Sequence, residues 1–425
     1  MDLKQCTMAQ ILREHGREYL DQHAFQLSYE QERAVADIIA CRTAEMGGHC
    51  EHRRCDCCGH ETKGYNSCGN RACPKCGALA KSRWIANRRE ELLPVQYFHV
   101  VFTIPEQLGQ VAFQNRRVVY DLLFKTSAKT LLTIAADPKR LAAHIGFTSI
   151  LHTWGSTLLH HPHIHMIVPG GGISLDGERW VDCREDYLLP GEVLSALFRR
   201  LFLEALEKAF AEKQLRFTGK LEKLAHGPTF REWLRSHRRM KWVVYVKPPS
   251  GGPETTLDYL ARYTHRTAIS DHRLIGMREG KVTFRYKDHA NNKELRVMTL
   301  DAQEFIRRFL IHVPAKGFVR IRYYGLFVNR YRAQNIKRCR MLLNAPDPEA
   351  IVQDENMHWA DRYLALTGYD PLLCPVCKKG RLQLVDDKRE RANDNDGPSS
   401  TVRSPQQVDP PGATCPVPVA ESPPP

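Results

Sequence analysis

The feature that most constrains this sequence is a dense group of cysteines near its N-terminus. Of the 14 cysteines in the chain, eight lie between Cys41 and Cys76. They include two turns of the form Cys-x-x-Cys-Gly, one at Cys55 and Cys58 and one at Cys73 and Cys76. Such a turn directs two thiolates at one point, and the glycine permits the tight backbone that follows. We therefore expect these two turns to complete one tetrahedral, structural zinc site.

Other residues of the same stretch could hold a second zinc ion. The spacing alone does not show which of these candidate ligands would share one ion. Cys50 is adjacent to His49 and Cys57 is adjacent to Cys58, and these neighbours are better placed to bind zinc. We therefore interpret Cys50 and Cys57 as bystanders that do not bind the metal. The further candidate zinc ligands are Cys41, His49, Cys68 and His60.

The charge balance indicates a polyanionic partner. The chain has 62 lysines and arginines against 48 acidic residues, a net charge of +14, and a pI near 9.2. This surplus favours DNA, and Arg71 and Lys75, which alternate with the cysteines, are predicted DNA contacts. A zinc ribbon that mediates only protein contacts is the alternative.

The sequence gives no reason to expect a membrane partner. It contains no apolar run of about twenty residues and no basic-then-apolar leader. We therefore expect a cytoplasmic bacterial protein, associated with the nucleoid when bound to DNA. In that compartment, metal ligation explains the cysteines better than disulfides do.

A second motif, HHPHIHMIV at residues 160–168, points to a metal of a different kind. In a strand, His163 and His165 project to one side, while Ile164 and Met166 project to the other. Pro162 fits the first residue of a strand, because it cannot donate to the ladder. The histidine pair suits a divalent cation, which we expect to be Mg²⁺ or Mn²⁺. The alternative for an isolated His-x-His is the polar face of an ordinary strand.

The third ligand of this cation has two candidates. The run GFTSILHTW at residues 146–154 predicts a strand that can form an antiparallel hairpin with the histidine strand, and this would bring His152 beside the pair. His152 is therefore preferred. His99, on the predicted strand QYFHVVFTIP, is its rival. His160 and His161 precede the predicted strand, and we expect them to contact DNA or solvent.

A pair of tyrosines supplies candidate nucleophiles. The run DYLARYTHR predicts a helix in which Tyr259 and Tyr263 stand one turn apart, so both hydroxyls reach the same region. Taken alone, they could form an aromatic face packed on the core. Arg262 and Arg266 favour a phosphate-binding surface instead, and both are predicted DNA contacts. A tyrosine hydroxyl could attack a metal-polarised phosphate and leave a 5′-phosphotyrosine with a free 3′-hydroxyl.

These motifs carry a family resemblance. HHPHIHMIV and YLARYTHR resemble the metal-binding and nucleophile motifs of the HUH single-strand endonucleases. The wider order GGH, CxxCG, YNSC, NRxCPKC, FHVVFTIP, LHTWG, HPHIH, GGG, YLARYTHR and GFVRIRYYG resembles the rolling-circle insertion-sequence transposases of the two-tyrosine type, which have an N-terminal zinc-binding domain. The resemblance spans about Cys41 to Arg332. One departure is Ala72, where this group usually has histidine.

The resemblance implies a function and an assignment of residues. It implies a transposase that nicks and joins single-stranded transposon ends and target DNA. His163 and His165 would be metal ligands, and Tyr259 and Tyr263 would be nucleophiles. A plasmid replication initiator or relaxase of the same chemistry is the first alternative. A zinc-dependent DNA-binding regulator without catalysis is the second.

The expected fold is α+β, an HUH-like antiparallel sheet with helices packed largely on one side, preceded by a small cysteine-rich domain. The palm-like topology is an implication of the resemblance. A last Cys-x-x-Cys turn, Cys374 and Cys377, is half a zinc site that could pair with Cys339, pair with another chain, or hold no metal. The expected domains are a helical lead-in with the zinc-binding domain (1–93), the catalytic domain (94–335), a C-terminal extension (336–385) and a disordered tail (386–425).

Overall fold

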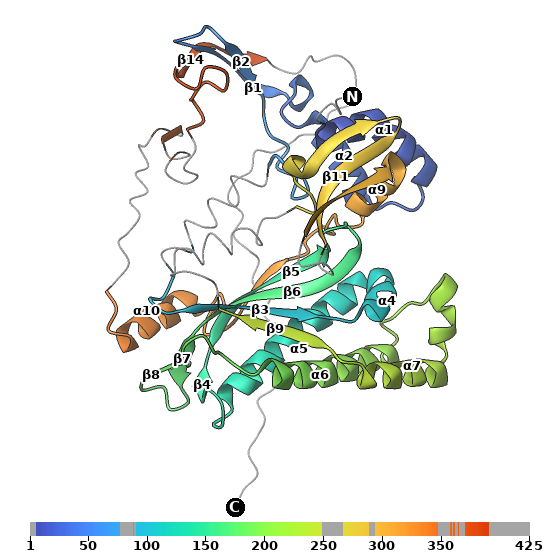
Figure 1. The fold of residues 1–425 in the computed structure, drawn as a ribbon, viewed down its shortest axis with the longest axis vertical. Helices are drawn as coiled ribbons and strands as arrows, with labels where there is room; N and C mark the ends of the chain where they lie inside the picture. Colours follow the sequence, from blue (N-terminus) through green and yellow to red (C-terminus); the bar gives the residue numbers. More distant parts are fainter. Residues whose placement is uncertain are drawn as a thin grey trace, which may run out of the picture.

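The computed structural model describes most of the chain, and its fold is α+β, as expected. The described residues are 6–76, 88, 91–248, 267–288, 294–346, 358, 360, 361, 364 and 370–390. They form antiparallel sheets with packed helices in three parts, which Figure 1 shows as a lower, an upper right and an upper left body. No helix in these ranges is long and apolar enough to cross a membrane.

The lower body is built on a five-stranded sheet with the order β13-β5-β6-β3-β9. Every neighbouring pair is antiparallel. The strands are β3 (Tyr97–Thr103), β5 (Gly146–Trp154), β6 (His160–Pro169), β9 (Val243–Lys247) and β13 (Ile321–Gly325). The two strands predicted around His99 and His152 are therefore confirmed. β13 lies at the edge of the sheet, next to β5.

Helices cover one face of this sheet and create the largest core (Figure 1). Phe98, Val100 and Phe102 of β3 alternate with side chains that face the other way, and all three are buried in this core together with Ile164 and Met166 of β6. The alternation of the histidine strand is thus confirmed. The covering helices are α4 (Gly109–Gln114), α5 (Arg116–Ala136), α6 (Gly191–Ala211) and α7 (Gly227–Arg239).

A hairpin of β5 and β6 positions the histidines. His152 pairs with His163, and Ile150 pairs with His165. Directly opposed residues of an antiparallel pair project to the same face, so the three imidazoles share the face opposite the helices α4 to α7. A register shift follows between His152 and Trp154. The predicted hairpin is confirmed.

The upper right body combines the N-terminal helices with a segment from the second half of the chain around a second core. Leu12 of α1 and Val35 of α2 are buried against Phe284 of β11 and Phe305 and Phe309 of α9. The elements of this body are α1 (Met8–His23), α2 (Tyr29–Ala40), β10 (Leu274–Arg278), β11 (Lys281–Asp288), β12 (Glu294–Asp301) and α9 (Ala302–Leu310). Glu279 and Gly280 both have positive φ in the turn of the β10–β11 hairpin.

This second core crosses the expected domain boundaries. The amide of Met8 donates to Asp271 Oδ1 at 2.9 Å, and Gln31 Nε2 donates to the carbonyl of Leu310 at 2.9 Å. Residues from the expected catalytic domain therefore complete the core of the N-terminal helices. The boundary predicted at residue 93 does not separate two cores, because hydrophobic burial joins segments that sequence order keeps apart.

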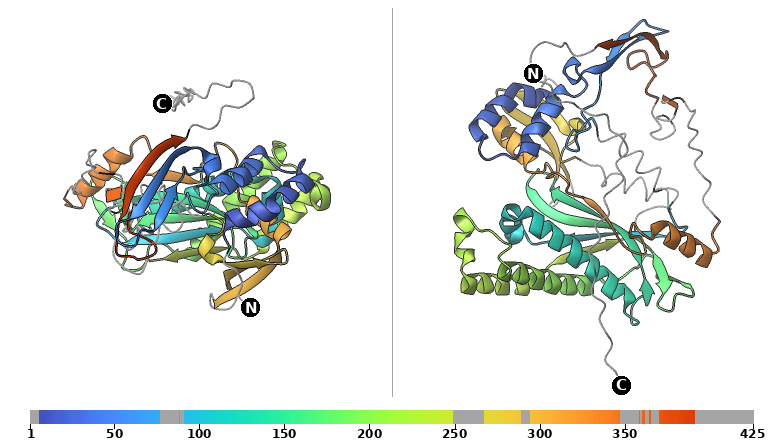
Figure 2. Two further views of the ribbon diagram at one scale, coloured as in Figure 1. Left: turned by 90° about the horizontal axis from the view of Figure 1, so that it is seen from above. Right: turned by 180° about the vertical axis from the view of Figure 1, so that it is seen from behind.

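The upper left body is a three-stranded sheet with the order β14-β1-β2, and Figure 2 shows it from two further sides. Its strands are β1 (Gly48–Cys55), β2 (Glu61–Gly64) and β14 (Leu382–Glu390). β14 pairs with β1 as far as Glu390. The start predicted for the disordered tail, residue 386, is therefore wrong, since backbone pairing orders the next residues. The predicted tail beyond residue 390 lies outside the described residues.

The remaining elements are short. A small sheet has the order β4-β7-β8. Most of the basic segment at residues 78–93 lies outside the described residues. The bounds are β4 (Ala143–His144), β7 (Gly171–Ser174), β8 (Trp180–Asp182), α10 (Arg332–Leu342), and the 3₁₀ turns η1 (Ala44–Met46), η2 (Glu106–Leu108), η3 (Gly219–Ala225) and η4 (Asp271–Arg273).

Candidate metal centres

Three imidazoles converge on the face of the central sheet opposite the helices α4 to α7. His152 on β5 and His163 and His165 on β6 each offer a ring nitrogen, and these nitrogens lie within 4.8 Å of one another. His152 and His165 are buried, with 4% and 7% of their surface exposed. Three neutral imidazoles at this separation can share one divalent cation.

Hydrogen bonds orient two of these rings. His163 Nδ1 lies 2.7 Å from the carbonyl oxygen of His161. A carbonyl only accepts, so Nδ1 of His163 carries the proton and Nε2 keeps its lone pair for a metal. His165 Nδ1 lies 2.7 Å from His99 Nε2. If His165 donates in this contact, its Nε2 is also left as a metal ligand.

His99 therefore occupies a supporting position in this arrangement. It contacts the far nitrogen of His165, and it is not one of the three converging residues. Burial lowers the pKa of His99 to about 4, with nearby Lys247 adding to the effect. A neutral His99 can accept the proton of His165 near neutral pH, as partners of metal-bound histidines do.

Two neighbouring histidines differ from their expected environment. His160 and His161 were expected before the strand, but both lie within β6. His160 Nε2 is 2.7 Å from the hydroxyl of Tyr120, and its ring packs against Phe113. Burial lowers the pKa of His160 to about 4. The first residues of the histidine run are thus partly structural, because the strand begins earlier than the proline indicated.

Tyr245 on β9 is a residue of this face that sequence reasoning missed. It pairs with Val101, which in turn pairs with His165, so Tyr245 lies in line with the histidines two strands away. At about 4.8 Å between strands, this places it roughly 10 Å from His165. It is 55% exposed. The alternation in WVVYVK, with a tyrosine and a lysine two residues apart, was the available signal.

The predicted nucleophiles cannot be placed against this centre. Tyr259 and Tyr263 lie outside the described residues, as do Arg262 and Arg266.

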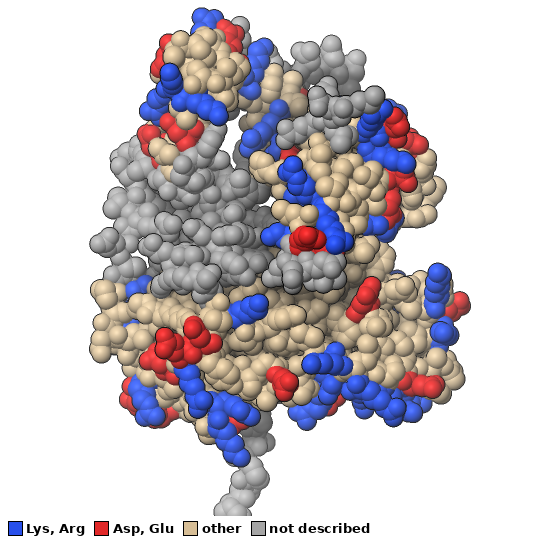
Figure 3. All heavy atoms as spheres, viewed as in Figure 1, with Lys and Arg blue, Asp and Glu red and all other residues tan. Residues whose placement is uncertain are grey.

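The other two predicted DNA contacts are described. Arg71 donates to the carbonyl oxygens of Phe318 at 2.8 Å and Ala315 at 3.2 Å, so it links the cysteine-rich loop to the segment before β13. Lys75 is half-buried beside Cys76. On the described part of the face in Figure 3, Lys and Arg side chains are scattered over all three bodies, and they do not form one patch.

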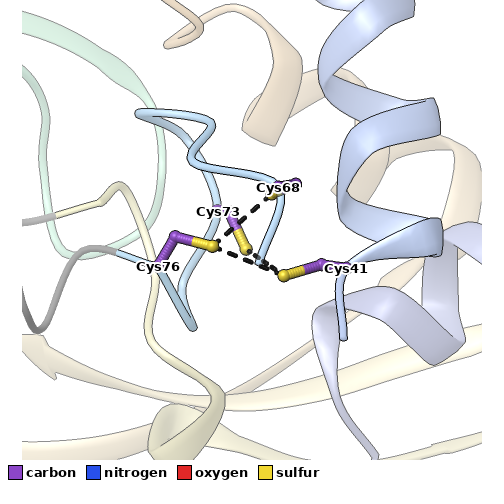
Figure 4. A group of neighbouring side chains, drawn as sticks. All are labelled: Cys41, Cys68, Cys73 and Cys76. Carbon is purple, nitrogen blue, oxygen red and sulfur yellow. Dashed lines mark hydrogen bonds between the residues drawn. The ribbon is translucent and has the colours of Figure 1, made fainter. Parts of the chain in front are cut away.

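A first cluster of four cysteines lies at the edge of the second core. Cys41 follows α2, whereas Cys68, Cys73 and Cys76 come from one loop, and Figure 4 shows their sulfur atoms pointing toward one another. The sulfur of Cys41 is 3.4 Å from that of Cys76 and 3.7 Å from that of Cys73, and Cys68 is 3.5 Å from Cys76. Tetrahedral zinc with bonds of about 2.3 Å separates its sulfurs by about 3.8 Å, so these four fit the ion.

A second cluster contains the other predicted turn. Cys55 and Cys58 meet Cys374 and Cys377, and their ligand atoms lie within 4.8 Å of one another. The expected single site of Cys55, Cys58, Cys73 and Cys76 is therefore wrong. Each predicted turn belongs to a different cluster, because β1 and β2 separate them.

The remaining cysteine expectations are resolved in part. Cys377 does not pair with Cys339, which lies in α10 and is buried among apolar side chains. Cys57 is exposed and outside both clusters, as expected for a bystander. Neither His60 nor Ala72 is in a cluster. His49 lies on β1, but its side chain is outside the described part of the structure.

Comparisons with known proteins agree with this arrangement. A family model described as a putative transposase matches residues 146–335, and a model described as a transposase zinc-binding domain matches residues 11–104. The cysteine clusters support bound zinc in that domain. No solved structure matches the chain significantly.

Two relatives match along most of their length. The putative transposase y4qJ of Sinorhizobium fredii (strain NBRC 101917 / NGR234) is 50% identical over 379 residues, which cover 89% of this chain and 94% of the relative. The transposase for insertion sequence element IS801 of Pseudomonas savastanoi pv. phaseolicola is 28% identical over 359 residues, 81% of this chain and 80% of the relative.

Proposed function

The chain belongs to the IS91 family of transposases, and we propose that it cuts and joins single-stranded transposon ends by metal-dependent tyrosine transesterification. The observation that carries this proposal is the convergence of His152, His163 and His165 on one face of the central sheet. A family of DNA-processing proteins needs a site for a scissile phosphate, and three oriented imidazoles can supply its metal.

The three histidines would hold one Mg²⁺ or Mn²⁺ ion. When bound, the cation would polarise the scissile phosphate and neutralise charge that develops on it. His99 and the carbonyl of His161 would fix the ring orientations of His165 and His163. Three imidazoles are a softer donor set than Mg²⁺ usually takes, so Mn²⁺ should act at lower concentration.

Tyr259 or Tyr263 would supply the nucleophile. Its hydroxyl oxygen forms a bond to phosphorus as the bond from phosphorus to the 3′-oxygen breaks, and the departing oxygen takes up a proton. The products are a 5′-phosphotyrosine and a free 3′-hydroxyl. The reverse reaction with a different 3′-hydroxyl joins two DNA segments without ATP, and a second tyrosine would allow two such transfers. The resemblance of YLARYTHR supports these roles.

The exposed ring of Tyr245 would guide the single strand across the sheet. A base stacked on an aromatic ring contributes about 1–3 kcal/mol, and this contribution depends little on sequence. Tyr245→Ala should weaken binding of single strands, whereas Tyr245→Phe should restore it, because the ring and not the hydroxyl stacks.

The direct test uses labelled single-stranded oligonucleotides that contain each transposon end. Incubation with Mn²⁺ should yield a covalent product that survives heat and detergent. Exchange of both tyrosines for phenylalanine should abolish this product, whereas either single exchange should spare some cleavage and block complete transposition. The absence of product with every end sequence would refute the mechanism.

The same assay separates the alternatives. A plasmid replication initiator or relaxase would cut a plasmid origin in preference to transposon ends. A zinc-dependent regulator would bind DNA and form no covalent product with either substrate.

A further inference from the structure

The second cysteine cluster joins segments from opposite ends of the chain. Cys58 and Cys374 are 316 positions apart, yet their sulfur atoms lie 3.7 Å from each other. Cys55 and Cys377 lie 3.6 Å apart across 322 positions. The zinc-binding model ends at residue 104 and the transposase model at residue 335, so neither covers Cys374 and Cys377.

These distances distinguish metal ligation from a disulfide. A disulfide holds its sulfurs about 2.05 Å apart. Tetrahedral zinc holds them about 3.8 Å apart, close to the 3.6 and 3.7 Å observed here. The four sulfurs thus have the separation of one zinc site and not of two disulfides.

The two turns also have the backbone geometry of zinc knuckles. The amides of Cys57 and Cys58 donate to the sulfur of Cys55 at 3.4 and 3.5 Å. In the C-terminal turn, the amide of Gly380 donates to the sulfur of Cys377 at 3.3 Å. These donors stabilise thiolates, which are the form that binds zinc. Lys378 has a positive φ of 54°, as the tight turn requires.

The knuckles are fitted to each other and not only to an ion. The amide of Arg381 donates to Asp56 Oδ1 at 2.8 Å, and the amide of Asp56 donates to the carbonyl of Arg381 at 3.1 Å. A Cβ atom at Gly380 would lie 2.5 Å from the sulfur of Cys55 and 2.5 Å from Asp56 Oδ1. Only glycine therefore permits the approach of the two turns.

The described residues of this small body form only a minimal apolar core. Its apolar core consists of Cys55, Cys374 and Leu382, with Cys377 packed against them. A hairpin as short as β1 and β2 is marginal in water, and the third strand, β14, comes from the far end of the chain. Bodies with so small a core usually depend on a metal for folding.

We propose that Cys55, Cys58, Cys374 and Cys377 bind a second structural zinc ion that clasps the C-terminal segment to the N-terminal zinc-binding domain. The zinc ribbon is then a composite of both ends of the chain. The residues between them, including the transposase domain, are tethered at both sides. This inference concerns metal content and assembly, and it stands whether or not the proposed cleavage mechanism is correct.

The first test counts zinc in the purified full-length chain by mass spectrometry under native conditions. We expect two ions in the parent protein and one in Cys374→Ser or Cys377→Ser. Cys57→Ser is the matched control, because this exposed thiol lies between two ligands and outside the cluster; it should keep two ions. Two ions in Cys374→Ser, or loss of an ion from Cys57→Ser alone, would overturn the ligand assignment.

A second test does not require any ligand variant to fold. A protease site inserted between residues 348 and 349 allows the zinc-loaded protein to be cut after purification. The C-terminal fragment should remain bound to the rest and should dissociate when a strong chelator removes zinc. Release of the fragment before chelation, or retention after complete zinc removal, would show that the clasp does not depend on the metal.

Gly380→Ala tests the interlocking of the turns while every thiol remains. It should weaken retention of one zinc ion against a chelator by at least tenfold and leave the other ion unchanged. Unchanged retention of both ions would overturn the close approach.

Discussion

The histidine centre and the cysteine centres are assembled in different ways. The histidines come from two strands of one hairpin, so His152 and His163 are directly paired neighbours. The cysteines of the second cluster come from two turns that are distant in sequence, one at the end of β1 and the other before β14. A local hairpin positions a site by its register alone, whereas a site made of distant segments depends on the fold of everything between them. Four experiments challenge or refine this contrast.

The largest effect is expected at the histidine centre. His163→Ala and His165→Ala should each lower cleavage by about 10³-fold or more, because an unpolarised phosphate loses several kcal/mol of transition-state stabilisation. Zinc content and DNA binding should be kept. His144→Ala is the control, since His144 is an exposed residue of β4. Equal loss of DNA binding would indicate that the pair contacts DNA instead of a metal.

The two cysteine clusters should differ in their effect on stability. Cys41 and Cys73 are 2% and 1% exposed and belong to the second core. Cys73→Ser should therefore release zinc and cost about 3 kcal/mol or more, which corresponds to roughly 10 °C in the melting temperature. Cys374→Ser should release zinc with a much smaller change, because its core is small. Calorimetry of both variants makes the comparison, and equal losses would contradict it.

His99→Gln should separate metal affinity from catalysis. The loss of a partner to a metal-bound histidine typically weakens metal binding 10–100-fold. The Mn²⁺ concentration for half-maximal cleavage should rise by this factor, while the rate at saturating Mn²⁺ should change little. A fall in the saturated rate with unchanged Mn²⁺ dependence would instead place His99 against the substrate.

The smallest effect concerns a histidine outside any metal centre. His312 Nδ1 accepts from the hydroxyl of Thr153 at 3.0 Å, and its Nε2 donates to the carbonyl of Leu158 at 3.0 Å. Burial lowers its pKa to about 3. The unfolded chain takes up this proton near pH 6.5, so the contribution of neutral His312 is present above pH 6.5 and is lost as the pH falls toward 3.

This pH dependence can be measured directly. The loss should reach up to about 1.4 kcal/mol per pH unit below 6.5. Melting temperatures at pH 7.5 and 5.5 should therefore differ less in His312→Gln than in the parent protein. The exposed His144→Gln should leave the difference unchanged. An unaltered pH dependence in His312→Gln would show that other groups cause the acid loss.

Local patterns predicted the parts of the structure that depend on near neighbours. The strand at 146–154 and the hairpin to His163 follow from side-chain alternation along the sequence. The convergence of His152 with the pair follows from the same hairpin. These features need no knowledge of the remainder of the chain.

The cysteine grouping could not be predicted in this way. The turns at Cys55 and Cys73 share the pattern Cys-x-x-Cys-Gly, so the sequence favours a single zinc site formed by both. Only the position of β14 shows that the turn at Cys55 meets a different partner, the turn at Cys374. The burial of His160 against Tyr120 is a second example, because α5 approaches the strand from outside the motif. The spacing of cysteines in the sequence shows which ligands a turn can provide. It does not show which distant segment packs against that turn.

The second core has a consequence for synthesis on the ribosome. Gln31 donates to Leu310 across 279 positions. At about 5–20 residues per second, the N-terminal helices wait roughly 14–56 s for the helix that covers their apolar faces. The first segments to be made are therefore among the last to be completed. During that interval the nascent chain exposes hydrophobic surface, so a holding chaperone should bind the N-terminal helices until translation passes residue 310.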